Sequence, residues 1–340
     1  MSRKEKARHE AEGLVRALYR GMLGREVDPD GLAHWTHVLL SGMASPAGVA
    51  QRFLDSEEFR RRTAVKLFVP PGHYYSPVVD PAEAAAHLAA VRATDAAAVA
   101  GIAIDHAAMV SLWRELVPLF ASCPFPARKT SPYRYYFENE SYAWGDGSML
   151  HAMLRHVRPK RLIEVGSGWS SACTLDTVER FLDGDCRITM IEPYPELLRE
   201  LVPKMPANVE VVAKRVQDVP PALFETLSAG DVLFIDSTHV MRTGSDVCFE
   251  LFEILPRLAP GVLVHFHDMF WPFEYPDIWA ITDNRSWNEL YAVRAFLTGN
   301  DDWKIVMFND YMAQRERAEV EVSYPAFLRN PGGALWMQRL

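Results

Sequence analysis

The sequence has 340 residues, 49% of them hydrophobic and 24% charged, and this balance predicts a folded, soluble protein with one large domain and a smaller one. Its 36 basic and 44 acidic side chains give a formal net charge of −8, so the whole chain offers no general attraction to nucleic acid or to an anionic membrane. No segment resembles a signal peptide or approaches the roughly 20 apolar residues of a membrane span, which predicts a cytoplasmic protein.

Residues 1–63 are predicted to form a small helical module, because three stretches between residues 8 and 63 carry helical periodicity. Asp30 and Ser45 stand where helix N-caps are expected, and Gly42 where a helix would end. The stretch resembles a helical module related to phycobilisome-linker domains. The resemblance rests on Leu18, Tyr19, Leu23, Gly24, Arg25, Asp30, Gly31, Trp35, Gly42, Phe53, Ser56, Glu58 and Phe59. It implies a module that docks a protein partner and carries no chemistry; a plain helical cap on the main domain is the alternative.

Residues 64–130 are predicted to form a connector with a loop and helices. The loop FVPPGHYYSP cannot lie inside a helix, and residues 106–120 have a helical pattern. His73, Tyr74, Tyr75 and Ser76 on this loop either close over a pocket as a lid or pack on the surface.

Residues 131–340 are predicted to form an α/β domain. Seven β-rich runs, most of them separated by helical patterns, predict a mostly parallel sheet with helices on both faces. The expected strands are 161–165, 188–192, 209–213, 232–236, 262–266, 303–308 and 334–340. The last two are expected as a hairpin whose final strand is antiparallel, which is the strand count of a Rossmann-like methyltransferase sheet.

The run RLIEVGSGWSSACTL marks a ligand-binding turn between the first strand and a helix. Glycines let the backbone approach a ligand, and the free N–H groups of a helix start can bind it. NAD-binding folds use a G-x-G-x-x-G turn at this place, but Ser171 stands at the third glycine position here. The form E-x-G-x-G resembles motif I of class I S-adenosylmethionine-dependent methyltransferases. The turn residues that this resemblance implies for cofactor binding are Glu164, Gly166, Ser167, Gly168 and Ser170.

Further cofactor contacts are expected at the ends of the next strands. Glu192, at the end of the second strand, can accept hydrogen bonds from both ribose hydroxyls, and Gln217 and Asp218 after the third strand would lie beside the adenine edge. Asp236 ends the fourth strand at the carboxyl edge of the sheet, where open α/β folds bind ligands.

A metal site is expected where the fourth and fifth strands end. Asp236, His267 and Asp268 would form a cluster of nitrogen and oxygen ligands for Mg²⁺ or Mn²⁺. The arrangement resembles metal-dependent O-methyltransferases of the catechol type and those that act on macrolide sugars, although His267 stands where those families more often have a carboxylate. In the alternative, Asp268 caps a turn and His267 packs in the core.

His239 is the candidate catalytic base. It follows Asp236 by three residues, the spacing at which the same families carry the Lys or His that removes the acceptor proton. A neutral hydroxyl is a poor nucleophile, so a base that titrates near pH 7 assists methyl transfer. A solvated loop histidine is the alternative.

The sequence therefore predicts an S-adenosylmethionine-dependent methyltransferase. The expected reaction is metal-assisted O-methylation of a sugar or glycan hydroxyl. Aromatic and polar residues in 136–146, 269–279 and 283–291 are expected on the acceptor side. Three alternatives stay open: a methyltransferase for a small secondary metabolite, a non-catalytic docking protein that binds a nucleotide-like ligand, and an NAD-dependent dehydrogenase.

Overall fold

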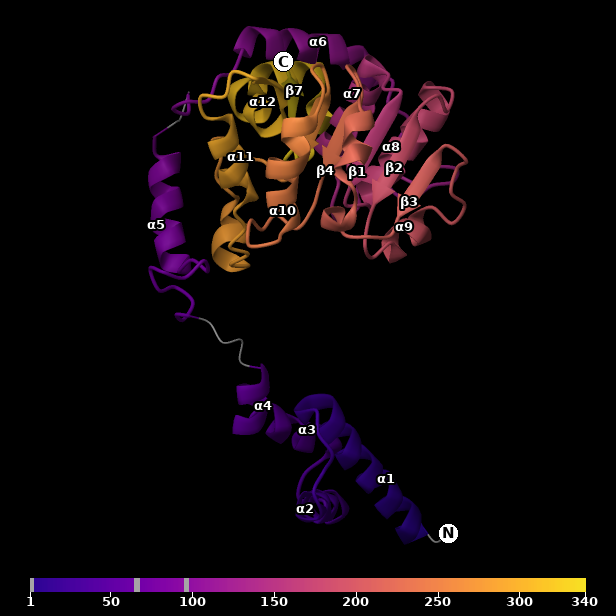
Figure 1. Ribbon diagram of the computed structural model, residues 1–340, viewed down its shortest axis with the longest axis vertical. Helices are drawn as coiled ribbons and strands as arrows, with labels where there is room; N and C mark the ends of the chain where they lie inside the picture. The colour runs from indigo at the N-terminus through magenta and orange to yellow at the C-terminus, as the bar shows by residue number, and fades with distance from the viewer. Residues whose placement is uncertain (1–2, 64–67, 95–97) are drawn as a thin grey trace. The chain divides into compact units, whose positions relative to one another are not determined.

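The computed structural model describes residues 3–63, 68–94 and 98–340 (Figure 1). The chain divides into two compact units, Met1–Pro70 and Pro71–Leu340. Within the described ranges, none of the helices has the length and hydropathy that a membrane crossing requires.

The first unit is helical and has its own small core. Its helices are α1 (Arg3–Leu18), continued by the π-helical turn η1 (Tyr19–Leu23), α2 (Pro29–Leu40), α3 (Pro46–Leu54) and α4 (Glu57–Thr63). Val15, Tyr19, Val38, Val49 and Phe53 are among the buried side chains that pack together. This unit therefore buries apolar surface without help from the sheet of the second unit.

The helix ends of the first unit confirm two of the three sequence predictions. Ser45 caps α3, with its hydroxyl accepting from Gly48 N, and Gly42 follows α2 with a left-handed φ of 74°. The prediction for Asp30 was wrong, because Asp28 caps α2 by accepting from Gly31 N at 2.7 Å. Pro29 occupies the first helical position, which proline favours, so the helix begins two residues earlier than predicted.

The second unit is built on a seven-stranded sheet with the order β3-β2-β1-β4-β5-β7-β6. Strands β1 to β5 are parallel, and β7 lies antiparallel between β5 and β6. The strands are β1 (Arg161–Val165), β2 (Arg187–Ile191), β3 (Val209–Val212), β4 (Val232–Ile235), β5 (Leu263–Phe266), β6 (Trp303–Phe308) and β7 (Leu335–Arg339). The predicted Rossmann-like methyltransferase fold with an antiparallel last strand is confirmed.

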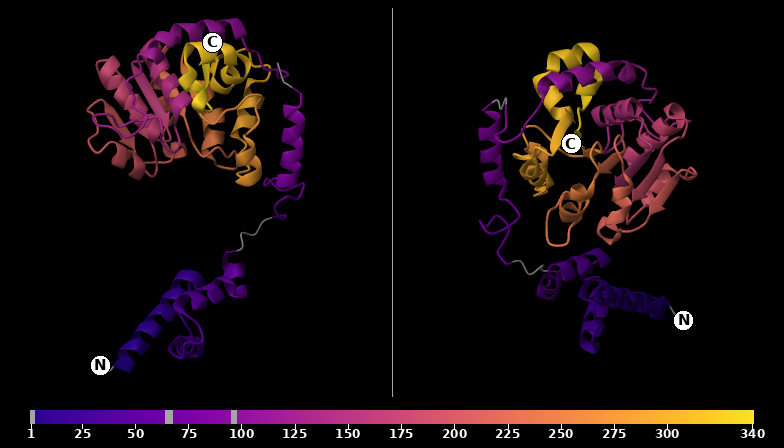
Figure 2. Two further views of the ribbon diagram at one scale, coloured as in Figure 1. Left: turned by 180° about the vertical axis from the view of Figure 1, so that it is seen from behind. Right: turned by 45° about the horizontal axis from the view of Figure 1, so that its top comes forward.

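The sheet runs between groups of helices that cover it, and α5 stands apart from the strands (Figures 1 and 2). The helices of the second unit are α5 (Pro81–Arg92), α6 (His106–Ala121), α7 (Trp144–Val157), α8 (Trp169–Phe181), α9 (Glu196–Leu201), α10 (Asp246–Phe249), α11 (Glu289–Leu297), α12 (Asn309–Arg315) and α13 (Arg317–Ser323). The expected hairpin of the last two strands was wrong, since α12 and α13 lie between them in the chain. The strands nevertheless pair as antiparallel neighbours.

The core of the second unit is continuous across the sheet. Strands β4 and β5 are buried along their whole length, as expected for strands covered on both faces. All four cysteines are free, with Cys173 and Cys186 buried. Polar side chains follow the carboxyl ends of β1, β4 and β5. This edge of the sheet carries the candidate site.

Candidate active site

The turn after β1 is shaped by Gly166. Its φ is 80°, and a Cβ added there would lie 1.8 Å from the carbonyl oxygen of Asp236. The close approach follows from the parallel pairing of β1 and β4, in which Asp236 N donates to Val165 O at 2.9 Å. Only glycine fits this position, so the turn brings the end of β1 directly against the end of β4.

Glu164 and Ser171 brace the turn from inside the protein. The buried Glu164 carboxylate accepts from the hydroxyls of Ser170 at 2.6 Å and Ser171 at 2.8 Å, and Ser171 Oγ also accepts from Gly168 N. Burial raises the pKa of Glu164 to about 8. The Glu164 side chain thus stabilises the start of α8 and lies outside the lining of the cavities described next.

Two cavities meet at the carboxyl ends of β1, β2 and β4. One of about 190 Å³ lies over the turn and the start of α8, and one of about 590 Å³ extends toward the ends of β2 and β3. Gly166, Glu192 and Asp236 line both, and Ser167, Gly168 and Ser170 line the smaller one. Together they form a trench across the sheet edge, at the place where doubly wound folds bind nucleotide-like ligands.

Of the three residues expected after β2 and β3, two line the larger cavity. The Glu192 carboxylate accepts from Ser167 N at 3.1 Å and Tyr194 N at 2.8 Å, which ties the second strand's tip to the turn. Gln217 lines the cavity and donates to Gly244 O, whereas Asp218 makes an ion pair with Arg215 at 2.8 Å and lies outside the lining.

The predicted metal ligands come together with the predicted base in one cluster. Asp236, His267 and Asp268 place one ligand atom each within 4.8 Å of one another. His267 Nδ1 lies 3.4 Å from a carboxylate oxygen of Asp236 and of Asp268, and His239 Nε2 lies 3.4 Å from Asp236 Oδ1 and 3.3 Å from Asp268 Oδ2. His265, two residues earlier on β5, instead stacks on Phe234 in the core.

Glu289 and Asp146 lie behind the two histidines, and the sequence did not single them out. Glu289 Oε2 lies 2.7 Å from His239 Nδ1, and Asp146 Oδ2 lies 3.4 Å from His267 Nε2. Both carboxylates are buried. They belong to segments 283–291 and 136–146, which the sequence indicated only for the acceptor side. In each segment, a charged residue among aromatic residues is the feature that could have indicated a role in the site.

The charges of the cluster shift its protonation equilibria. Burial lowers the pKa of His239, but its contacts with Asp236 and Glu289 outweigh burial and raise the pKa to about 10. Burial likewise opposes the charged form of Asp236, yet the neighbouring His267 and His239 lower the pKa of that carboxyl well below its usual range. For Asp268, Glu289 and Asp146 burial prevails and raises the pKa. The ion-free cluster therefore balances buried carboxylates against imidazolium groups.

A divalent cation fits this set of residues. Carboxylate oxygens and imidazole nitrogens are both metal ligands, and a cation would balance the carboxylates in place of the protons. Both ring nitrogens of the buried His267 lie 3.4 Å from carboxylate oxygens, beyond the range of a good hydrogen bond. Such a nitrogen costs free energy unless a ligand satisfies it. The alternative in which His267 merely packs leaves that cost unexplained.

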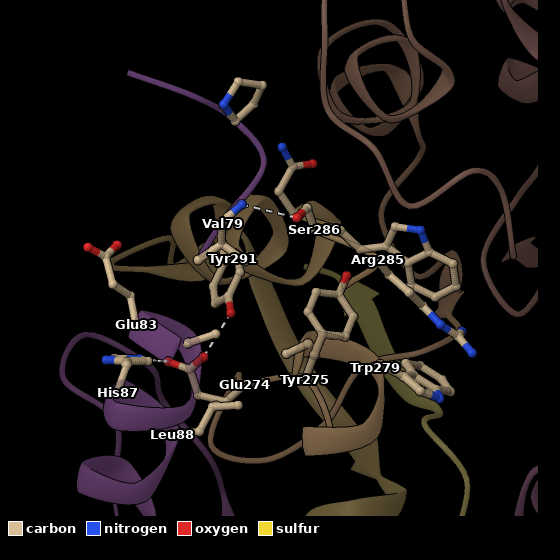
Figure 3. Close-up of a pocket in the computed structure, with 15 residues that line it drawn as sticks. Val79, Glu83, His87, Leu88, Glu274, Tyr275, Trp279, Arg285, Ser286 and Tyr291 are labelled. Atoms are coloured by element: carbon tan, nitrogen blue, oxygen red, sulfur yellow. Dashed lines mark hydrogen bonds and ion pairs between the residues drawn. The ribbon is translucent and has the colours of Figure 1, made fainter. Parts of the chain in front are cut away.

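A third cavity, of about 350 Å³, lies beside the cluster (Figure 3). Helix α5 forms one wall with Ala84 and Leu88, and segment 274–291 forms the other, with the aromatic rings of Tyr275, Trp279, Trp287 and Tyr291. The Trp287 ring lies 4.4 Å from the His239 ring, so the cavity and the cluster share a wall.

Polar contacts hold α5 against segment 274–291. Glu274 accepts from Tyr291 Oη at 2.8 Å and lies 2.8 Å from His87 Nε2, and Val79 N donates to Ser286 Oγ at 3.2 Å (Figure 3). The predicted lid loop contributes Pro77 to the cavity, whereas the rings of Tyr74 and Tyr75 contact each other at a tilt and remain 80% and 63% exposed. The later residues of the loop and α5, not the two tyrosines, thus cover the cavity.

Comparison with known proteins assigns both units of the chain. Residues 163–269 match the family described as Methyltransferase domain, and residues 3–63 match the family described as Domain of unknown function (DUF4214). An uncharacterized protein of Archaeoglobus fulgidus is 32% identical over 171 residues, which cover 49% of this chain and 76% of the archaeal protein. The chain belongs to one family with that protein.

Solved structures with similar folds have lower identity. An S-adenosylhomocysteine-bound methyltransferase from Podospora anserina is 15% identical and covers 81% of this chain and 100% of its own, with a TM-score of 0.38. The O-methyltransferase TomG from Streptomyces achromogenes, solved with S-adenosylmethionine, is 14% identical over 74% of this chain and 96% of its own, also with a TM-score of 0.38.

The matched residues 163–269 contain the turn after β1, the tips of β2 and β4, and the metal-ligand candidates after β5. These are the parts that line the trench and form the cluster. The second unit of this chain is a class I S-adenosylmethionine-dependent methyltransferase domain.

Proposed function

We propose that this methyltransferase transfers the methyl group to an oxygen atom, with assistance from a divalent cation, and that the acceptor is a sugar or glycan hydroxyl. The observation that carries the proposal is the cluster of Asp236, His239, His267 and Asp268, which lies between the trench at Gly166 and the aromatic cavity. A bound cation and an acceptor hydroxyl would meet there.

The residues of the trench fit the parts of S-adenosylmethionine. The Glu192 carboxylate would accept from the ribose hydroxyls, the backbone at Gly166, Ser167 and Gly168 would lie against the amino-acid part, and Gln217 would lie beside the adenine. Bound S-adenosylmethionine would supply a sulfonium methyl group. The acceptor oxygen would attack the methyl carbon in line with the C–S bond, and S-adenosylhomocysteine would leave with the electron pair of that bond. Much of the rate acceleration would then come from holding the two partners in line.

Asp236, His267 and Asp268 would hold the cation, and a cation there supplies polarisation of the acceptor hydroxyl. His239 is placed for either of two roles. As a base, its Nε2 would take the hydroxyl proton, with Glu289 holding Nδ1. As a ligand, the same nitrogen would bind the cation, and the lowered pKa of the hydroxyl would make a separate base unnecessary.

The aromatic cavity supports a sugar as acceptor. Tyr275, Trp279, Trp287 and Tyr291 offer ring faces, and Asn288 and Ser286 offer hydrogen-bonding groups beside them. Cavities of a few hundred Å³ that are mostly apolar and carry a few polar groups bind small organic ligands. A small secondary metabolite with a phenolic ring also fits these walls, so it stands as the second candidate.

Isotope transfer to a panel of acceptors tests the proposal. The full chain, S-adenosylmethionine labelled in its methyl group and Mn²⁺ would be incubated with oligosaccharides, glycosides and catechol-type phenols. We expect label on the sugar oxygen of at least one glycoside and its loss when a chelator removes the cation. Label on a phenol alone would replace the sugar with the second candidate, and transfer that chelation leaves unchanged would refute cation assistance.

The remaining expectations concern the rest of the protein. We propose that residues 64–130 act as connector and lid over the acceptor, and that the helical module of residues 1–63, similar to phycobilisome-linker domains, docks a protein partner. Its three predicted helical stretches correspond to α1–η1, α2 and α3–α4. The cytoplasmic location stays a prediction.

A further inference from the structure

We infer that Asp236, His239, His267 and Asp268 form one four-residue centre for a first-row transition ion such as Mn²⁺, Co²⁺ or Zn²⁺, with His239 as a direct ligand. The inference rests on the cation of the proposed function and deepens it by naming a further ligand and the class of ion. It also assigns Glu289 and Asp146 as the residues that orient the two imidazole rings.

The histidine nitrogens of the cluster face its carboxylates at distances longer than good hydrogen bonds. Its four N···O distances, from His239 Nε2 and His267 Nδ1 to the Asp236 and Asp268 carboxylates, are all 3.3 or 3.4 Å. Good N–H···O hydrogen bonds are shorter, about 2.7–3.2 Å. Asp236, His267 and Asp268 each place one ligand atom within 4.8 Å of the other two, and His239 Nε2 faces both carboxylates of this group.

The ring nitrogens are divided between two kinds of partner. His239 turns Nε2 toward the cluster and holds its other nitrogen, Nδ1, 2.7 Å from Glu289 Oε2. His267 turns Nδ1 toward the cluster, and its Nε2 lies 3.4 Å from Asp146 Oδ2. A carboxylate behind each metal-binding histidine is the usual arrangement, because it fixes the tautomer and the ring orientation.

Both carboxylates behind the rings are buried, and Asp146 is also held by the backbone. Asp146 Oδ1 accepts from Gly333 N at 3.1 Å, and Asp146 and Glu289 expose 3% and 1% of their surface. Because both carboxylates are buried, contact with solvent does not explain their presence. Each would instead orient the imidazole ring beside it.

Two of the four proposed ligands have a strained backbone. The φ angles are 60° for His239 and 59° for Asp268, in the left-handed region that residues with a side chain rarely adopt. The His239 carbonyl accepts from Asn288 N and Glu289 N, both at 3.1 Å, so the start of α11 holds the strained residue in place. Backbone strain of this kind collects at functional sites, here where Nε2 must meet the two carboxylates.

The ligand set selects the class of ion. Two imidazole nitrogens with two carboxylates suit Mn²⁺, Fe²⁺, Co²⁺ and Zn²⁺, whereas Mg²⁺ prefers an all-oxygen shell and retains its waters. The sequence allowed Mg²⁺ because it assigned one histidine to the ion; a second nitrogen shifts the preference to transition ions.

Counting nitrogen ligands in the unaltered protein tests the inference directly. The full chain is stripped with a chelator and loaded with Mn²⁺, and pulsed electron paramagnetic resonance counts the ¹⁴N nuclei bound to the ion. We expect two directly bound nitrogens. One nitrogen would overturn the ligand role of His239 and leave it as the base.

Variants provide a second, independent readout. Binding of Co²⁺ and Mn²⁺ is measured by calorimetric titration. His239→Ala should weaken ion binding by at least about tenfold. His156 is an exposed histidine on α7, and the control variant His156→Ala should leave ion binding unchanged. Glu289→Ala should weaken binding by about 10- to 100-fold, and Glu289→Gln, which keeps a hydrogen-bond acceptor for Nδ1, should retain most of it. Unchanged affinity in His239→Ala would refute the inference, as would Mg²⁺ binding as tightly as Mn²⁺ in the wild type.

The outcomes separate this inference from the proposed function. Absence of binding by every divalent ion would remove the cation and the four-residue centre together. Binding through one nitrogen would remove only the centre and keep cation-assisted transfer. Thermal unfolding of each metal-free variant checks that the chain still folds.

Discussion

Gly166 is the residue on which the geometry of the trench depends most directly. It is the point where the ends of β1 and β4 touch, and the distance between its would-be Cβ and the Asp236 carbonyl leaves no room for a side chain. The neighbouring Gly168 differs, since its φ is 178° and an added Cβ would meet only the flexible end of Leu197 at 3.3 Å.

The two glycines therefore make a matched pair for mutation. Gly166→Ala should lower the free energy of unfolding by at least about 1–3 kcal/mol, the typical cost of a strained backbone, because the clash adds to the strain at positive φ. Gly168→Ala should fold with nearly wild-type stability. Urea unfolding of both variants measures this, and equal stability would show that the close approach to Asp236 is not rigid.

Titration of the buried His151 should make the stability of the second unit depend on pH. It is buried on α7, with Nδ1 3.0 Å from Thr177 Oγ1, and burial, reinforced by the Arg155 guanidinium, lowers the pKa of His151 to about 3. An unfolded histidine has a pKa of about 6.5. Between these two values the unfolded chain binds one more proton than the folded chain, so His151 makes stability fall as the pH is lowered below about 6.5.

Replacing the imidazole should remove this dependence. Between pH 7 and pH 5 the wild type should lose about 1–2 kcal/mol more stability than His151→Gln does. Urea unfolding of both proteins at several pH values measures the difference. Parallel curves would mean that His151 is protonated in the folded protein.

Helix α5 forms one wall of the aromatic cavity that we propose for the acceptor. It begins at Pro81 with Asp80 as its N-cap, and it carries Ala84 and Leu88 on its buried face and Ala86 on its exposed face. The spacing of Ala84 and Leu88 places both side chains against the cavity.

Filling the cavity from α5 should impair acceptor binding alone. Ala84→Phe places a ring among Tyr275, Trp279 and Tyr291, so the KM for the acceptor found in the isotope screen should rise while the Kd for S-adenosylmethionine stays the same. Ala86→Phe on the exposed face is the control and should change neither. Equal acceptor kinetics in both variants would place the acceptor elsewhere.

The strands and the trench could be predicted from the sequence because their signals are local. Each strand of the second unit was expected within one residue of its observed bounds, since β-rich runs are bounded by turns, and the glycine turn lies directly after one of them. The cap of α2 was misplaced because Asp28 and Asp30 both flank Pro29, and only the backbone at the helix start distinguishes them.

The roles of Glu289 and Asp146 could not be predicted, because they depend on contacts far apart in the chain. Glu289 meets His239 from 50 residues away, and Asp146 reaches His267 from the start of α7. The exposure of Tyr74 and Tyr75 also follows from tertiary packing and not from their loop sequence. Local patterns give the elements and the nearest ligands, and only the fold shows the residues that orient them.

At the scale of the whole molecule the two units have separate cores. Val15, Phe53 and their neighbours pack within the first unit, while the site lies wholly within Pro71–Leu340. We therefore expect residues 71–340 alone to fold and to bind S-adenosylmethionine with the affinity of the full chain. Thermal unfolding and calorimetry of this fragment measure both, and loss of cofactor binding by a folded fragment would show that the helical module contributes to the site.

We propose that the trench at Gly166 and Glu192 binds S-adenosylmethionine beside a cation. Calorimetric titration of the full chain with S-adenosylmethionine, S-adenosylhomocysteine and NAD, each with and without Mn²⁺, tests it most directly. We predict micromolar binding of the first two, none of NAD, and marked weakening in Glu192→Ala. Absence of binding by both methyl-cycle ligands with and without Mn²⁺ would show that the trench is not a cofactor site.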